Sequence, residues 1–351
     1  TQLATGAIRR GSARRSGEQI DREFEFLGTQ LGTDVANDWF GVTLDVVAAN
    51  LRPALDLVAD VVLHPSFPEA GVAEERALQL AAIRRSFDSS TQRPIALAFR
   101  DLFGTHPYAL AANGNETSVN GLGAADLAAW WRRFAVAEGA LILVVGDVEA
   151  DAARRLVEAA FSDLPGRAVP APALAAPPPP ATRTEMVEFR DRKQSAIAMT
   201  FAAAPPADAD AVPLRLLEAA TSGLAGTLFA ELRGRRSLAY TVFCGYLPRR
   251  EGGAILAYLA TDAGKELEAR TALLAELRRL SADGLSEADF ERAQKSLAGS
   301  TRIELQTNGA LLADYARNLL FGRELDATAR DLERARAVTL DELRAVAGRY
   351  L

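Results

Sequence analysis

The residues best suited to chemistry lie in one short stretch, ELRGRRSLAY, which runs from Glu231 to Tyr240. Arg233 falls near the end of a helix predicted over residues 226–236, and Tyr240 opens a predicted strand. A tight connection from Gly234 to Ser237 can direct both side chains to the same side. A guanidinium holds a peptide carbonyl or a carboxylate with fixed geometry. A phenol can donate a hydrogen bond to a developing oxyanion.

The same residues also have a purely structural interpretation. An arginine in the last turn of a helix offsets the helix dipole, and a tyrosine that opens a strand commonly serves packing. Arg235 and Arg236 are interpreted in this way, as solvated charges at a helix end. For Arg233 and Tyr240, the residue types alone leave both interpretations open.

Composition limits the classes of function. A length of 351 residues predicts two domains, and a net charge of -6 argues against a nucleic-acid partner. The single cysteine, Cys244, permits neither an intrachain disulfide nor a cysteine-based metal site. The two histidines, His64 and His106, each precede a proline and are expected in turns, so a histidine-rich metal site is excluded. The apolar runs are too short to span a bilayer.

A proline- and alanine-rich segment at residues 166–184 is predicted to link an N-terminal lobe, 1–165, to a C-terminal lobe, 185–351. Both halves place a helix before strand-like runs and then further helices. The shared order predicts an α+β fold of two homologous lobes, each an antiparallel β-sheet covered by helices on one face. In the first half the helices are expected at 17–28, 51–63, 74–87 and 125–134, and in the second half at 226–236, 266–280, 287–305 and 340–351.

The two halves differ at their ends. The second half has an extended run at 195–201 ahead of its first helix, whereas the first half begins directly in helix-like sequence. The first half closes with a predicted strand at 140–147 and a helix at 149–161, which have no counterpart before Leu351. We therefore expect the chain to be trimmed at both ends, so that its first sheet depends on further residues or on a partner.

Beside the duplicated order of elements, three segments carry a resemblance to a known family: LFAELRGRRSLAYTV, GTHPY from Gly104 to Tyr108, and GSARRSGEQI. In these features the chain resembles the pitrilysin or insulinase-like zinc metallopeptidases, the inverzincins. The resemblance covers nearly the whole chain. In that family, two histidines and a glutamate on the first helix, in the order His-x-x-Glu-His, and a distal glutamate form the zinc site.

The resemblance places Gln2, Thr5 and Gly6 at the His-x-x-Glu-His positions and Ala82 near the distal glutamate, with only the upstream Glu75 in register. Glycine and alanine side chains offer no ligand atom, so no zinc or other cofactor is expected in this chain.

In several branches of this family the peptidase is divided between two subunits. One holds the zinc motif, and the other, degenerate there, supplies an arginine and a tyrosine that match Arg233 and Tyr240. The resemblance therefore implies a His-x-x-Glu-His partner that holds zinc, a peptide substrate, and a chain that is inactive alone.

Two alternatives stay open: a scaffold subunit like the core proteins of respiratory complexes, and a homodimeric peptide-binding shell. The arginine-rich, lysine-poor composition favours a bacterial source. The resemblance implies a periplasmic location, with the cytoplasm as the alternative.

Overall fold

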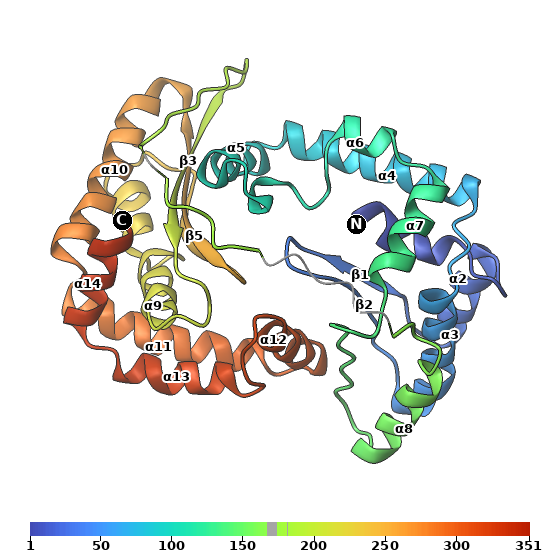
Figure 1. The fold of residues 1–351 in the computed structure, drawn as a ribbon. Helices are drawn as coiled ribbons and strands as arrows, with labels where there is room; N and C mark the ends of the chain where they lie inside the picture. The colour runs from blue at the N-terminus through green and yellow to red at the C-terminus, as the bar shows by residue number, and fades with distance from the viewer. Residues whose placement is uncertain (167–173, 181) are drawn as a thin grey trace. The chain divides into compact units, whose positions relative to one another are not determined.

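The computed structural model describes residues 1–166, 174–180 and 182–351, so part of the predicted linker lies outside the described residues. The chain divides into two compact units (Figure 1). Unit 1 contains Thr1–Ser86, Ala111–Ala173 and Leu311–Ala316, and unit 2 contains Phe87–Leu110, Leu174–Ala310 and Arg317–Leu351. The lobe boundaries predicted from the sequence follow the chain order and stay a prediction.

Unit 1 combines a small sheet with helices that enclose one apolar core. Its strands pair antiparallel, with Val35 opposite Phe40. Trp131 is buried in the core and donates its indole N–H to the Val62 carbonyl at 2.8 Å, while Trp130 packs half-buried against the same cluster. The elements are α1 (Gln2–Ala7), η1 (Ile8–Arg10), α2 (Gly17–Phe26), β1 (Gly32–Val35), β2 (Phe40–Thr43), η2 (Ala48–Asn50), α3 (Leu51–Leu63), α4 (Glu69–Asp88), α6 (Glu116–Asn120), α7 (Ala124–Phe134) and α8 (Ala150–Ala160).

Unit 2 is built on a larger antiparallel sheet in the order β3-β5-β4. The elements of unit 2 are α5 (Gln92–Phe103), η3 (Pro107–Ala109), β3 (Gln194–Ala203), α9 (Ala211–Thr221), η4 (Phe229–Arg235), β4 (Thr241–Arg249), β5 (Gly252–Asp262), η5 (Ala263–Lys265), α10 (Glu266–Asp283), α11 (Glu287–Glu304), α13 (Ala327–Ala337) and α14 (Leu340–Tyr350), and α12 (Asn308–Leu320) is shared between the two units.

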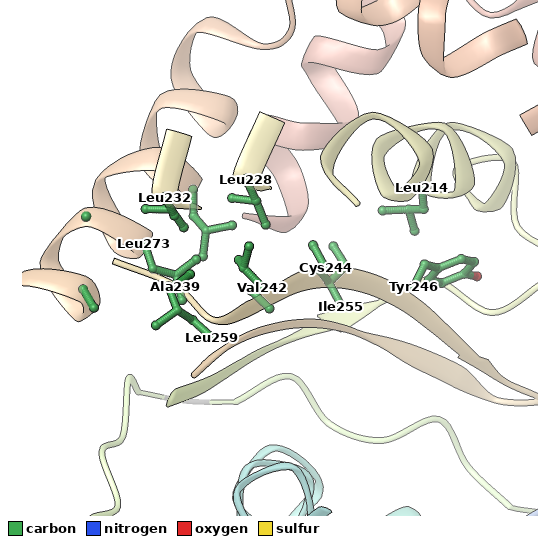
Figure 2. Close-up of a cluster of buried hydrophobic side chains, with 14 of the residues drawn as sticks. Leu214, Leu228, Leu232, Ala239, Val242, Cys244, Tyr246, Ile255, Leu259 and Leu273 are labelled. Atoms are coloured by element: carbon green, nitrogen blue, oxygen red, sulfur yellow. The ribbon is translucent and has the colours of Figure 1, made fainter. Parts of the chain in front are cut away.

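The main core of unit 2 lies between the sheet and its helices. Side chains at alternate positions of β5, including Ile255 and Leu259, face Leu228 and Leu232 of the preceding helical segment and Leu273 of α10. Figure 2 shows the leucines of the helical segment directed toward the strands. This burial of apolar side chains fixes the helical segment on the sheet.

The other face of the same sheet is covered by α5, a helix from the first half of the chain (Figure 1). Phe103 of α5 packs with Ala254 of β5. Because side chains alternate along a strand, Ala254 faces away from the main core that Ile255 and Leu259 face. The Tyr258 hydroxyl donates to the Ser90 carbonyl at 3.1 Å. Residues 87–110 group with unit 2 because these contacts tie them to β5.

The outer edge of β4 is occupied by side chains from α9 and the residue after it. The Ser222 hydroxyl donates to the Cys244 carbonyl and accepts from the Cys244 N–H at 2.9 Å. The Glu218 carboxyl accepts a hydrogen bond from the backbone of Tyr246, and burial, which outweighs that bond, raises the pKa of Glu218 to about 7. At Cys244 and Tyr246, backbone groups on the side of β4 away from β5 are thus bonded within the unit.

The α+β fold class predicted from the sequence is confirmed, but one predicted strand is not formed. Residues 140–147 form no strand and pair with none in the described parts of the chain, and Leu141 and Ile142 are exposed. Branched apolar residues favour strands only when a neighbouring strand takes up their backbone hydrogen bonds. No helix in the described ranges combines the length and apolar character needed to cross a membrane.

Candidate functional site

The stretch that carries Arg233 and Tyr240 leaves its helix through a π-helical segment, η4, rather than the α-helix expected from the sequence. The Arg236 N–H donates to the Glu231 carbonyl five residues earlier at 3.2 Å. Ser237 then adopts the left-handed conformation, with φ of 53°. Left-handed residues commonly end helices, and π-helical turns are frequent at functional sites.

The connection brings Arg233 and Tyr240 together. The Arg233 guanidinium donates to the Tyr240 carbonyl at 2.7 Å and lies 5.1 Å from the centre of the Phe229 ring. The Tyr240 N–H donates to the Ala260 carbonyl of β5 at 2.9 Å, which fixes the backbone directly before β4. The Tyr240 side chain is 54% exposed, and its hydroxyl makes no hydrogen bond to any described residue.

Both residues line one open pocket with a volume of about 270 Å³. Sequence reasoning missed two of its residues, Asp262, which ends β5, and Lys265, which ends the helical turn η5 after it. The one sequence feature that could have drawn attention to Lys265 is its rarity, because the chain has only three lysines. The pocket is lined by Arg233, Ser237, Leu238, Ala239, Tyr240, Asp262 and Lys265.

Arg235 and Arg236 lie outside the pocket lining and pair with one carboxylate. Their guanidinium nitrogens lie 2.6 and 2.8 Å from the Glu231 oxygens. The hydrogen bond from Arg236, together with the charges of both arginines, holds the pKa of Glu231 below its ordinary value. These contacts agree with the interpretation of Arg235 and Arg236 as helix-end charges.

The positions that the sequence resemblance assigns to the family's zinc ligands lie on α1 and α4 of unit 1. Thr5 is fully buried and donates its hydroxyl to the Thr1 carbonyl at 3.2 Å, while Gln2 and Ala82 are half-buried. A Cβ atom added at Gly6 would lie 2.6 Å from a Glu75 carboxylate oxygen. A side chain at Gly6 would therefore force Glu75 to move.

Glu75, the remaining carboxylate, is held by an arginine. The Arg10 guanidinium donates two hydrogen bonds to one Glu75 oxygen, at 2.8 and 3.1 Å, and approaches Glu74 at 3.4 Å. No cluster of three or more histidine, cysteine, aspartate or glutamate side chains in the described parts of the chain could hold a metal ion. Here the fold pairs Glu75 with a cation from its own chain.

We expect Arg10→Ala to lower the free energy of unfolding by about 1 to 3 kcal/mol, because it leaves the Glu75 carboxylate largely buried without its partner. The two side chains are only 20% and 16% exposed. Urea denaturation measures the change. The control is Arg22→Ala, which removes the exposed ion pair with Glu18 and should change stability by less than about 0.5 kcal/mol. Equal effects of the two variants would contradict a structural role for the Arg10–Glu75 pair.

The profile of the family described as "Peptidase M16 inactive domain" matches residues 121–297, just over half of the chain. The chain belongs to this family, and the resemblance found in its motifs is confirmed.

Relatives known from sequence extend the match along the chain. A Mycobacterium tuberculosis protein named as an uncharacterized zinc protease is 26% identical over 343 residues, which cover 96% of this chain and 78% of that protein. A Bacillus subtilis protein with the same description is 20% identical over 342 residues, or 96% of this chain and 82% of the relative.

Solved structures show the same fold. The peptidase M16 inactive domain from Pseudomonas fluorescens superposes with a TM-score of 0.89 at 23% identity, and covers 100% of this chain and 84% of its own. A chain of complex III2 from Candida albicans gives a TM-score of 0.83 at 16% identity, over 99% of this chain and 82% of that one. At these identities the likeness concerns the fold alone.

Proposed function

We propose that this chain is the catalytically incomplete subunit of a heterodimeric zinc metallopeptidase. The partner carries the His-x-x-Glu-His motif and holds the zinc, and this chain contributes Arg233 and Tyr240 to peptide binding and transition-state stabilisation. Membership in the inactive-domain family and the absence of a metal-binding group in the described residues support the division of labour.

The observation that carries the proposal is the arrangement of Tyr240. Its backbone is fixed on both sides, by the Arg233 guanidinium at the carbonyl and by Ala260 at the N–H. Its hydroxyl, by contrast, has no hydrogen-bond partner among the described residues, and Tyr240 is half-exposed and lines a pocket. The hydroxyl is therefore free to donate to a bound peptide while the backbone beneath it stays fixed.

Each residue of the pair then has a defined task. The Tyr240 hydroxyl donates to the oxyanion that forms when water adds to the scissile carbonyl, where a preorganised donor stabilises the transition state more than the substrate. Arg233 has five N–H donors and uses one group for the Tyr240 carbonyl, so the others can hold a peptide oxygen. Zinc in the partner would supply the activated water.

The second candidate is a non-catalytic subunit that supports an assembly, and the structural likeness to a chain of complex III2 favours it. Such a subunit has no use for an arginine and an exposed tyrosine that line one pocket. The two candidates therefore differ in whether peptide cleavage depends on this chain.

The test is reconstitution with a His-x-x-Glu-His chain encoded beside this one. We expect the two chains to co-purify, to contain zinc, and to cleave unstructured peptides only when combined. Metal analysis and a cleavage assay on each chain and on the pair measure this. Stoichiometric zinc in this chain alone, or unchanged cleavage by the partner without it, would contradict the proposal.

A further inference from the structure

Two cations border the pocket without a carboxylate partner. Arg233 and Lys265 both line it, and neither has a carboxylate within ion-pair distance among the described residues. Each donates instead to a backbone carbonyl: Arg233 to Tyr240 at 2.7 Å and Lys265 to Ser237 at 3.3 Å. Their positive charges are held in place but not neutralised.

Other cations near the pocket are paired with carboxylates. Directly beside the pocket, Arg235 and Arg236 share Glu231, and on α10 Arg270 pairs with Glu185 at 2.5 Å. Exposed cations of unit 2 thus commonly have an acidic neighbour. In the pocket lining, by contrast, Arg233 and Lys265 form no ion pair with any described carboxylate.

One carboxylate does line the pocket, but it is already engaged. Asp262 accepts the Gly264 N–H at 2.8 Å and caps the short helical turn η5, which ends at Lys265. Its part is to hold the turn that carries the lysine. With two cations and one carboxylate, the lining keeps an excess positive charge at the Arg233 and Lys265 side.

We propose that Arg233 and Lys265 form a carboxylate-binding subsite, so that the peptides accepted here carry a carboxylate close to the bond presented to Tyr240. The carboxylate belongs either to an acidic side chain or to a free C-terminus, since both present the same two oxygens to a guanidinium and an ammonium. The peptide as ligand rests on the proposed function; the charge preference rests on the pocket.

The test measures binding of short peptides to the purified chain by calorimetry at low ionic strength, because salt screens exposed charges. Three peptides of one sequence are compared: glutamine with an amidated end, glutamate with an amidated end, and glutamine with a free carboxyl end. We expect one carboxylate peptide to bind about tenfold more tightly than the neutral peptide. Which one does so identifies the source of the carboxylate.

Lys265→Gln should remove most of that preference, and Lys265→Arg, which keeps the charge, should retain it. The matched control is Lys295→Gln, which removes an exposed lysine paired with Glu291 on α11 and should leave the preference unchanged. Equal binding of all three peptides, or an unaltered preference in Lys265→Gln, overturns the subsite.

The two proposals fail separately. If Tyr240→Phe abolishes cleavage by the pair while Lys265→Gln keeps the full carboxylate preference, the subsite is wrong and the proposed function stands. If carboxylate peptides bind preferentially through Lys265 but no partner makes the pair cleave them, the proposed function is wrong and the subsite stands.

Discussion

Tyr240→Phe is expected to lower kcat of the reconstituted pair by about a hundredfold or more, the usual cost of losing one oxyanion donor. The hydroxyl is the one group removed, and it makes no hydrogen bond within the described chain, so folding and pairing should be preserved. Because the lost bond forms mainly in the transition state, KM should change little. Steady-state kinetics on a quenched fluorescent peptide give both values.

Tyr315→Phe on α12 serves as the control, since it removes a phenol hydroxyl outside the pocket lining. Its kcat should equal that of the unaltered pair. If the Tyr240→Phe pair kept its full kcat, the hydroxyl would have no part in the reaction, and Tyr240 would return to the structural interpretation that its position at a strand start also allows.

Leu232→Ala is expected to lower the free energy of unfolding of the chain by about 2 to 5 kcal/mol, as for other fully buried leucines. Leu232 is 0% exposed and contributes to the cluster between η4 and the sheet (Figure 2). Its carbonyl also accepts the Leu238 N–H at 2.8 Å, so the same residue packs the core and shapes the connection that directs Arg233 and Tyr240. Urea denaturation followed by circular dichroism measures the loss.

The matched control is Leu224→Ala in the loop before the same segment. Leu224 is 81% exposed, so its truncation should change stability by less than about 0.5 kcal/mol. Similar losses in the two variants would mean that the leucine cluster does not hold η4 on the sheet. A normal stability of Leu232→Ala with an altered pocket would point instead to a purely local role.

The sequence predicted those parts of the fold that depend on local patterns. The apolar alternation of β4 and the amphipathic repeat of α10 each appear close to where they were expected. The unpaired segment at 140–147 was predicted wrongly, because its composition favours a strand while its pairing depends on distant residues. The packing of α5 on β3 was likewise not predictable, since it joins segments about a hundred positions apart, as in the hydrogen bond from Thr200 to the Ala98 carbonyl.

The candidate site likewise combines features that depend on local sequence with features that depend on distant residues. The convergence of Arg233 and Tyr240 followed from a short connection in the sequence, although the π-helical turn and the left-handed Ser237 that produce it left no recognisable pattern. Lys265 reaches the pocket only because β5 lies beside β4, a relation set by register. The pairing of Arg10 with Glu75 spans 65 positions and could not be read from either residue.

The occupied edge of β4 has a consequence for the chain before it meets any partner. Open strand edges invite pairing with a second molecule, which leads to aggregation. Here Ser222 bonds both backbone groups of Cys244, and Glu218 bonds the backbone of Tyr246, so an approaching strand would have to displace them. If the chain pairs with a second subunit as proposed, these contacts protect this side of its sheet from polymerising with copies of itself before the partner binds.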